Sequence, residues 1–391
     1  MINKFPNITH INDVLPAIEG RKEFKHGMNS PHFDMVAYYI QASDTFTPDD
    51  PIVAALRREC RGFLFHKDGS VARRAFHKFF NLGEANETMP ENIDLSKPHI
   101  ILEKLDGSMV APFISKLDNE VYWASMRGSW DYHNRLKSLF SKTAYETLVR
   151  ETDKDDLTVI MEFCAPDNRI VVEYDAPNMT LLAIRNRSTG AYLPRSEIVE
   201  WGQKTQVPVV QPYVFDYENL STLTSHIRAV EGMEGIVLYF DDGLLVKLKG
   251  EWYSQLHKLL SCFDFEKDIA RLILSNNQDD LLGILSTPRK AELISYQDSL
   301  LEGLAVTAEK CESLAANITK QDMSRKDFAQ SDLSPSPVIK DIIFKNFDNF
   351  SDANFINDLM ATGIKNTTTG TRWDEFKFQA GLSLNWGPEI E

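Results

Sequence analysis

Cysteine is scarce in this chain, and the few cysteines lie far apart. The 391 residues include four of them, Cys60, Cys164, Cys262 and Cys311, with no CxxC pair. This spacing predicts neither a zinc site nor a disulfide framework. Isolated thiols of this kind are typical of small buried residues in a reducing compartment, so we expect a cytoplasmic protein.

Long apolar runs are also missing. No stretch approaches the roughly 18 residues that a membrane span needs, and the N-terminal segment MINKFPNITHINDV lacks the apolar core of a signal peptide. We therefore expect no membrane partner. With 43% hydrophobic and 25% charged residues, the composition is typical of a folded soluble protein, and the length suggests about two to three domains.

Positive charge is in short supply, because 42 Lys and Arg face 57 Asp and Glu, which gives a net charge of −15. This balance excludes binding to nucleic acid through bulk positive charge. One island differs: residues 57–78 hold seven basic and two acidic residues. It could be a solvated edge hairpin, but on so acidic a chain it favours a phosphate-rich ligand. The basic residues are Arg57, Arg58, Arg61, Lys67, Arg73, Arg74 and Lys78.

The common phosphate-binding and metal-binding motifs are absent. The sequence contains no GxxxxGK[ST], no GxGxxG, no HExxH and no kinase signature set. These absences argue against P-loop NTPases, dinucleotide-binding domains, zinc proteases and kinases.

The pattern of apolar residues divides the chain near residue 255. Before it, short apolar runs such as HIILEKL, TVIMEFC, MTLLAIR, GIVLYF and LLVKLK alternate with turn residues, which predicts antiparallel strands. Apolar residues recur at helical spacing over residues 129–151, which predicts one helical stretch. We expect an α+β domain over 1–255 and an all-helical domain over 256–391. Helices are expected near 264–285 and 338–348, and along one apolar face formed by Leu300, Leu304, Ala308, Cys311, Ala315 and Ile318.

A candidate nucleophile lies in the segment Glu103-Lys104-Leu105-Asp106-Gly107-Ser108. The segment could be an ordinary hairpin with an Asp-Gly turn. Alternatively, Lys104 stands at the end of a strand as an attacking amine. An amine attacks phosphorus only in its unprotonated form, which burial or neighbouring cations favour.

Such neighbours occur in Leu244-Leu245-Val246-Lys247-Leu248-Lys249. Period-two alternation turns Lys247 and Lys249 to one face of a strand. They could be simply exposed, or they could bind a triphosphate beside Lys104.

Two carboxylates stand at strand positions. Glu162 shares a face with Ile160 and Cys164, where a carboxylate needs a partner such as a ribose hydroxyl or a cation. Glu234 precedes a predicted strand, where it could be an exposed loop residue or hold a hard ion such as Mg²⁺.

Together these segments resemble the covalent nucleotidyltransferases, the superfamily of ATP-dependent ligases and capping enzymes, with Lys104-Leu105-Asp106-Gly107 as the nucleophile box. The similarity is strongest to the phage type-1 RNA ligases that repair cleaved tRNA, over about residues 55–260. Its supporting segments are Glu59-Cys60-Arg61-Gly62, Lys78-Phe79-Phe80-Asn81-Leu82, Glu162 to Ile170, Glu234-Gly235, Lys247-Leu248-Lys249 and Trp252-Tyr253.

The resemblance implies three steps: AMP is transferred from ATP to Lys104, then to an RNA 5′-phosphate, and a 3′-hydroxyl finally seals the strand. It implies ATP as co-substrate, Mg²⁺ (or Mn²⁺ in its place), RNA ends such as nicked tRNA as partners, no obligatory protein partner, and the host cytoplasm if a phage encodes the chain. The implied roles are Lys104 as nucleophile; Asp106 and Gly107 shaping its loop; Lys247 and Lys249 at the α-phosphate; Arg61 and Lys78 at the ATP phosphates or RNA end; Glu162 at the ribose; Glu103 among the cofactor-binding residues; and Glu234 at the metal.

One segment departs from the family pattern. Where the family commonly has Ser-Lys-Gly, Arg127 follows Ser125-Met126, so a planar guanidinium replaces a point charge in the cofactor-binding set. A DNA ligase or capping enzyme remains an alternative, although its downstream OB-fold would require strands after residue 260. A non-catalytic protein that binds RNA ends, or a helical adaptor with an unrelated β domain, would not need Lys104, Glu234 and Lys247.

Overall fold

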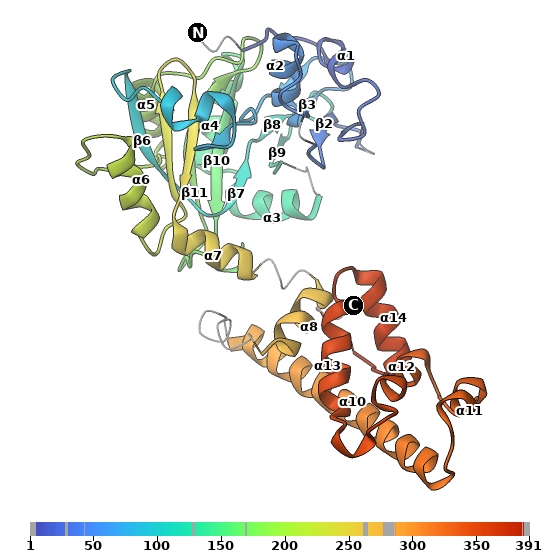
Figure 1. Cartoon of the computed structure of the whole chain (residues 1–391). Helices are drawn as coiled ribbons and strands as arrows, with labels where there is room; N and C mark the ends of the chain where they lie inside the picture. Colours follow the sequence, from blue (N-terminus) through green and yellow to red (C-terminus); the bar gives the residue numbers. More distant parts are fainter. Residues whose placement is uncertain are drawn as a thin grey trace. The chain divides into compact units, whose positions relative to one another are not determined.

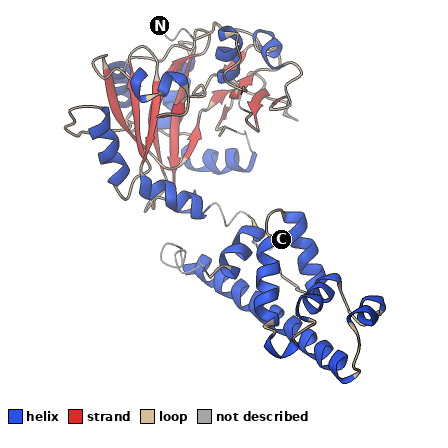
Figure 2. Ribbon diagram, in the orientation of Figure 1, coloured by secondary structure: helices blue, strands red, loops and turns tan. Residues whose placement is uncertain are grey.

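The chain forms two compact units, Met1–Gln255 and Leu256–Glu391, which are coloured along the sequence in Figure 1. The computed structural model describes residues 5–27, 30–42, 44–126, 130–168, 170–260, 265–276, 285, 287–384 and 386. Strands and helices mix in the first unit, whereas the described residues beyond 256 form helices and connecting loops with no strand (Figure 2). The predicted α+β fold class is confirmed.

Two sheets of the first unit carry the candidate site. One has the order β5-β13-β12-β6 and is antiparallel except for the parallel β5–β13 pair. The other has the order β11-β10-β7 and is antiparallel throughout. The five runs predicted as strands are all strands. The bounds are β5 (Phe80–Asn81), β6 (His99–Lys104), β7 (Ser108–Val110), β10 (Leu157–Cys164), β11 (Asn178–Asn186), β12 (Gly235–Phe240) and β13 (Leu245–Lys249).

The chain crosses from one sheet to the other directly after Lys104. Strand β6 pairs with β12, and β7, which begins at Ser108, pairs with β10. The interpretation of this segment as a simple hairpin with an Asp-Gly turn is therefore wrong. The crossing places Lys104 at a strand end, next to the point where the backbone leaves its sheet.

Alternation along the strands places apolar side chains on the outer face of each sheet. Val246 and Leu248 join a core cluster with helix α6 (Leu220–Ala229). Val159, Met161 and Phe163 join a second cluster, which includes residues of helices α4 (Ala144–Asp153) and α5 (Arg195–Thr205). The period-two predictions for these two strands are confirmed, and they leave the lysines and Glu162 on the other faces.

A third sheet, of order β1-β2-β3-β4, completes the first unit with a short β8–β9 ribbon. Buried Glu59, at the end of α2, accepts ion pairs from Arg74 Nη2 at 2.9 Å and Arg185 Nη2 at 2.7 Å. Burial opposes its ionisation, but the two guanidinium groups hold its pKa at about 2. The bounds are η1 (Ile11–Asp13), α1 (Leu15–Ile18), β1 (Phe24–His26), β2 (Asp34–Tyr38), α2 (Pro51–Glu59), β3 (Arg61–Phe65), β4 (Val71–Arg73), η2 (Asn86–Thr88), η3 (Pro90–Asn92), β8 (Phe113–Ile114), β9 (Val121–Tyr122) and η4 (Pro166–Asn168).

The helical stretch expected over 129–151 is two helices, α3 (Trp130–Phe140) and α4. Lys142 has a left-handed backbone with φ of 59°, and the Thr143 side chain caps the first turn of α4. A capping threonine after a left-handed residue ends one helix and starts another. The expectation of a single stretch is wrong at this point.

The second unit contains the long helix that the sequence predicts. Helix α10 (Thr287–Lys320) buries all six residues of the predicted apolar face in one core cluster. Ser336 caps α12, and Pro337 is its first residue. The other helices are α7 (Glu251–Leu260), which spans the unit boundary, α8 (Glu266–Leu274), α11 (Arg325–Gln330), α12 (Pro337–Asn346), η6 (Phe350–Asp352), α13 (Phe355–Asn366) and α14 (Gly370–Ala380). No helix among the described residues is long and apolar enough to cross a membrane.

Candidate active site

Glu234 joins the candidate nucleophile to one of the predicted phosphate-binding lysines. Gly235, the first residue of β12, pairs with Lys104 on one side and Lys249 on the other. The preceding Glu234 accepts ion pairs from Lys104 Nζ at 2.6 Å and from Lys249 Nζ at 3.0 Å. Its side chain is only 5% exposed. The register of three neighbouring strands therefore brings two amines to one buried carboxylate.

Lys247 stands on the same face of β13 as Lys249, opposite Asn81 of β5. Burial, together with the positive charges of Lys78 and Arg61, lowers the pKa of Lys247 to about 7. Its ammonium group also lies 5.0 Å from the centroid of the Phe79 ring. A lysine with so low a pKa is typical of a site that binds or transfers charged groups.

Glu162 belongs to the other sheet, on the face of β10 opposite Val159, Met161 and Phe163. Burial raises its pKa to about 7, against the attraction of Lys104, and the negative charge of Glu234 adds to the increase. Charges influence one another in this way only at short range. Glu162 therefore belongs to the same electrostatic cluster as Lys104 and Glu234.

Asp106 anchors the short segment between Lys104 and Ser108, where the chain passes from one sheet to the other. Its Oδ2 accepts hydrogen bonds from the backbone N–H groups of Val171 and Val172, both at 2.7 Å. Its Oδ1 accepts a 2.7 Å hydrogen bond from the Tyr253 hydroxyl, and its own N–H donates to the Tyr174 hydroxyl at 3.0 Å. Asp106 is 1% exposed, so these buried hydrogen bonds hold the segment in place.

Two positions must be glycine, because the backbone of a neighbouring strand approaches each of them closely. A Cβ at Gly107 would lie 2.3 Å from the carbonyl oxygen of Phe163, and a Cβ at Gly235 would lie 2.1 Å from that of Leu248. Gly235 also has a φ of +148°, which side-chain-bearing residues rarely adopt. Both glycines stand next to the residues that position the Lys104 amine.

The basic island of residues 57–78 is mostly structural. Arg73 and Arg74 are 0% exposed, and Arg57 is 9% exposed. Arg73 donates to the carbonyl oxygens of Gly62, Ala111, Ala124 and Ser125, whereas Arg58 pairs with Glu87 at 2.7 Å. The interpretation of the island as one phosphate-binding surface is wrong for these buried arginines, because protein groups already surround them.

The structure brings most of the predicted site residues together. Arg61 and Lys104 act electrostatically on both Lys247 and Glu162. Lys78 acts on Lys247, Glu234 acts on Glu162, and Lys249 is ion-paired with Glu234. Glu103 is not among them, because it pairs with Ile236 and shares the outer, apolar face of the sheet. Arg127 lies outside the described residues.

The sequence does not predict the contacts of three residues near the site, Tyr253, Tyr174 and Arg73. Tyr253 and Tyr174 hold Asp106, and Arg73 joins the Gly62 carbonyl of β3 to that of Ser125. The segment Trp252-Tyr253 carries part of the family resemblance. However, the sequence does not show that Tyr253 binds Asp106, which lies 147 residues earlier in the chain.

A metal ion at this site would depend on few protein ligands. No group of three or more His, Cys, Asp or Glu side chains suited to a metal occurs in the part of the chain that the structure describes. Mg²⁺ is commonly held by one or two carboxylates together with substrate phosphates. The buried carboxylate of Glu234, with Glu162 close by, fits that limited donor set.

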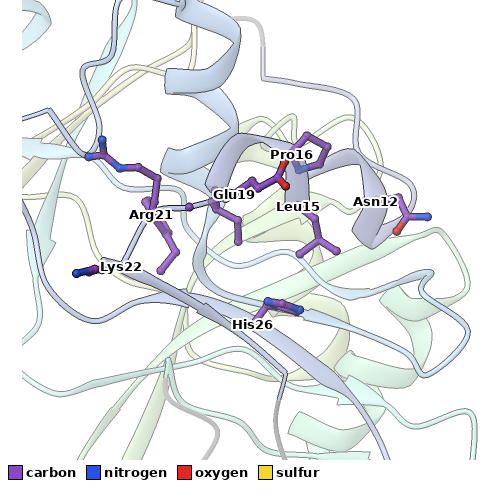
Figure 3. A pocket seen from close by; sticks show the side chains of 10 residues that line it. Asn12, Leu15, Pro16, Glu19, Arg21, Lys22 and His26 are labelled. Carbon is purple, nitrogen blue, oxygen red and sulfur yellow. The ribbon is translucent and has the colours of Figure 1, made fainter.

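A hollow that is separate from these residues lies beside α1 and β1 in the first unit. It has a volume of about 770 Å³, and the side chains of Asn12, Glu19, Arg21, Lys22 and His26 lie around it in Figure 3. Arg21 is paired with Glu23 and Asp44. None of the predicted site residues lines this hollow, so it is separate from the candidate active site.

Comparison with known proteins identifies the family. The family model described as RNA ligase matches residues 59–253. The protein named "Putative RNA ligase" of Thermovibrio ammonificans is 29% identical over 334 residues, covering 82% of this chain and 84% of that protein. RNA ligase 1 of bacteriophage TS2126 is 28% identical over 246 residues, covering 59% and 58%.

Among solved structures, an archaeal ATP-dependent RNA ligase is similar at 17% identity with a TM-score of 0.47, covering 75% of this chain and 78% of that one. The matched residues 59–253 include the nucleophile box, the Glu162 strand, Glu234 and both lysines of β13. The chain therefore belongs to the phage type-1 RNA ligase family, and it is an RNA ligase.

Proposed function

We propose that Lys104 carries AMP between ATP and an RNA end. The Lys104 amine attacks the α-phosphorus of ATP, its N–P bond forms, and pyrophosphate leaves. An RNA 5′-phosphate oxygen then attacks the same phosphorus and releases Lys104. Finally an RNA 3′-hydroxyl attacks the activated 5′-phosphate, which seals the strand and releases AMP. The observation that carries this proposal is the Lys104–Glu234–Lys249 contact at a strand end.

The cations around Lys104 suit phosphoryl transfer. Negative charge spreads over the phosphoryl oxygens in the transition state, and fixed positive groups stabilise it. We assign Lys247 and Lys249 to the α-phosphate, because they share the face of the sheet that carries Lys104. Arg61 and Lys78, whose charges act on Lys247, are assigned to the remaining phosphates or the RNA end, and Arg127 keeps the cofactor-binding role that the family resemblance implies.

Glu162 and Glu234 have different proposed roles. Glu162 binds the ribose hydroxyls of AMP, since its partly buried carboxyl group lies near Lys104 and burial raises its pKa to about 7. Glu234 forms an ion pair with the Lys104 amine at 2.6 Å and so orients it. It would also hold Mg²⁺, or Mn²⁺ in its place, together with the ATP phosphates. Bound there, the ion would neutralise charge that develops on the phosphate.

The segment around Lys104 is organised before any substrate binds. Asp106 is fully engaged with Val171, Val172 and Tyr253, and Gly107 lets the backbone approach β10 closely. Preorganisation of this kind lowers the cost of reaching the reactive geometry. We infer that Asp106 and Gly107 serve the reaction by fixing the direction from which Lys104 approaches phosphorus.

The natural RNA is proposed to be a nicked tRNA, with the helical unit contributing to its selection and no obligatory protein partner. The similarity to the phage protein named RNA ligase 1 supports RNA as the substrate, and the choice of tRNA follows from the family resemblance. Cys60, Cys164 and Cys311 are buried free thiols, which supports a reducing cytoplasm, that of a host cell if a phage encodes the chain.

A labelling experiment tests the proposal. The protein is incubated with α-labelled ATP and Mg²⁺ and then denatured, and protein-bound label is measured. Wild type and Lys97→Ala, which alters an exposed lysine of the same region, should carry label, whereas Lys104→Ala should carry none. Unlabelled wild type would exclude the lysyl-AMP mechanism. Sealing of a nicked tRNA anticodon loop, compared with an unstructured RNA of equal length, then tests the substrate.

A further inference from the structure

Arg73 is a buried cation without a carboxylate partner. It is 0% exposed, and no ion pair joins it to Asp or Glu among the residues that the structure describes. Burial, followed by the nearby positive charge of Arg61, lowers its pKa to about 9. The next residue, Arg74, is equally buried but is ion-paired with Glu59. Arginine is almost never fully buried unless it is paired, so the position of Arg73 requires another explanation.

The Arg73 guanidinium binds the backbone of three separate segments. All its hydrogen bonds go to carbonyl oxygens, and a guanidinium presents its donors in a fixed planar arrangement. The three carbonyl groups therefore keep set directions relative to Arg73 and to the Gly62 carbonyl. Nη1 donates to Ala111 at 3.1 Å, to Ala124 at 2.8 Å and to Ser125 at 3.0 Å, and Nη2 donates to Gly62.

Gly62 forms a bulge in β3 directly after Arg61. The pairing of β3 with β2 shifts register between Val36 and Ala37, and Gly62 has no partner residue there. Gly62 has a left-handed backbone with φ of +72°, and its carbonyl oxygen accepts the hydrogen bond from Arg73 Nη2. A bulge changes the direction of the side chains beside it. Arg73 therefore fixes the bend from which the Arg61 side chain leaves the strand.

The contact with Ala111 fixes the strand that Arg61 reaches. Ala111 directly follows β7, on which Met109 stands opposite Glu162. Arg61 Nη1 lies 3.5 Å from Met109 Sδ, so the Arg61 side chain extends from β3 to β7, beside Glu162. Arg73 thus holds both ends of this contact, the bulge that directs Arg61 and the strand that receives it.

The third segment, residues 124–126, lies directly against the bulge. A Cβ at Gly62 would stand 2.2 Å from the carbonyl oxygen of Met126 and 3.0 Å from Arg73 Nη2. The backbones of the bulge and of this segment therefore touch, and the bond from Arg73 Nη1 to the Ser125 carbonyl keeps them together. No side chain at position 62 could replace this arrangement without moving one of the segments.

We propose that Arg73 is a positioning residue for phosphate binding: it holds the bulge of β3 against β7 and residues 124–126, and so keeps Arg61 directed at the phosphates of ATP. Arg73 itself touches no substrate, because its side chain is completely buried. The proposal rests on the function proposed above, in which Arg61 serves the phosphates and Lys104 accepts AMP.

The test measures binding of α,β-methylene-ATP to the full chain with Mg²⁺. The methylene bridge prevents pyrophosphate from leaving, so binding is measured without AMP transfer. Calorimetric titration gives the Kd and the fraction of protein that binds. Arg73→Met removes the charge and the planar fork, and Arg73→Lys keeps the charge without the fork. The control is Arg57→Met, which alters another buried arginine that donates to a carbonyl, that of Ala17 in α1, at 2.7 Å.

Arg73→Met is expected to raise the Kd by about tenfold, because Arg61 loses its fixed direction. Arg73→Lys should raise it as well, since one ammonium group cannot span the Gly62 and Ser125 carbonyls. Arg57→Met should leave the Kd unchanged. Lost stability alone lowers the fraction that binds and not the Kd, so an unchanged Kd for the Arg73 variants would overturn the proposal.

A double-mutant cycle tests whether Arg73 acts through Arg61. Arg61→Gln should raise the Kd by itself, and adding Arg73→Lys to it should change the Kd little further. Fully additive effects would overturn the proposal. Arg73→Lys carries the same comparison if Arg73→Met does not fold. Wild type that binds the analogue but never gains label from α-labelled ATP would refute the lysyl-AMP mechanism instead, so the two failures are distinguishable.

Discussion

Lys104 Nζ lies 2.6 Å from Glu234 Oε2, and this contact joins the end of β6 to the start of β12. The other carboxylate oxygen of Glu234 holds Lys249 at 3.0 Å. One carboxylate thus sets the position of the proposed nucleophile relative to a lysine proposed to bind phosphate. Removing its charge would leave two cations close together, and like charges repel when no anion separates them.

Glu234→Gln is expected to lower the rate of lysyl-AMP formation by about 100-fold or more, because the amide neither orients Lys104 as an ion-pair partner nor offers a charge to a metal. The measurement is single-turnover labelling with α-labelled ATP. Glu231→Gln, which alters an exposed glutamate of the same loop, is the control. Equal rates for Glu234→Gln and wild type would remove Glu234 from the site.

Gly107→Ala is expected to lose adenylation activity together with stability. The added methyl group would meet the Phe163 carbonyl at 2.3 Å and Cys164 Sγ at 2.8 Å, and overpacking of this kind costs about 1–3 kcal/mol. Gly370→Ala is the matched control, since a Cβ there meets nothing within 4 Å. Thermal unfolding and labelling should both decline for the first variant only.

Asp106→Asn should destabilise the first unit more than Tyr253→Phe does. Tyr253→Phe removes one hydrogen bond to Asp106, worth about 1 kcal/mol. Asp106→Asn turns an amide N–H₂ group toward one of three existing donors, from Val171, Val172 and Tyr253, and a buried unmatched donor costs about 1–3 kcal/mol. Urea unfolding of both variants measures the difference, and a larger effect of Tyr253→Phe would contradict this account.

The faces of the site strands could be predicted because a strand has a fixed period of two. Val246 and Leu248 belong to the outer core, and Lys247 and Lys249 to the other face, as the alternation predicts. The same rule places Glu103 away from Lys104, so its inclusion among the cofactor-binding residues came from the family resemblance and not from strand geometry.

Contacts between distant segments could not be predicted in this way. Arg73 and Arg61 are the same residue type in one short island, yet Arg73 is buried against backbone carbonyls, including those of Ala111 and Ala124, and Arg61 acts on Lys247. Which arginine is buried depends on how the chain folds back at Ala111 and Ala124, 38 and 51 residues away from Arg73. The crossing at Asp106 has the same origin, because a local Asp-Gly signal does not reveal that β6 and β7 join different sheets.

Lys247→Met should make the protein more stable while impairing adenylation. The pKa of Lys247 in the folded protein is about 7, against an ordinary value of 10.5, so folding into this site costs free energy whenever the lysine is protonated in the unfolded chain. Methionine fills similar space without a charge. We expect a melting temperature higher by about 3 °C at neutral pH. We also expect a lower rate of labelling, because a cation is lost from the proposed α-phosphate site.

The pH dependence identifies the cause of this gain. Between pH 7 and 10.5 the unfolded wild type binds more protons than the folded protein at this lysine, so wild-type stability rises with pH in that window. The stability advantage of Lys247→Met should therefore be largest below pH 7 and shrink as the pH approaches 10.5. Melting temperatures of both proteins from pH 6 to 10 measure it. An advantage that stays constant over this range would show that better packing, and not the charge of Lys247, separates the two proteins.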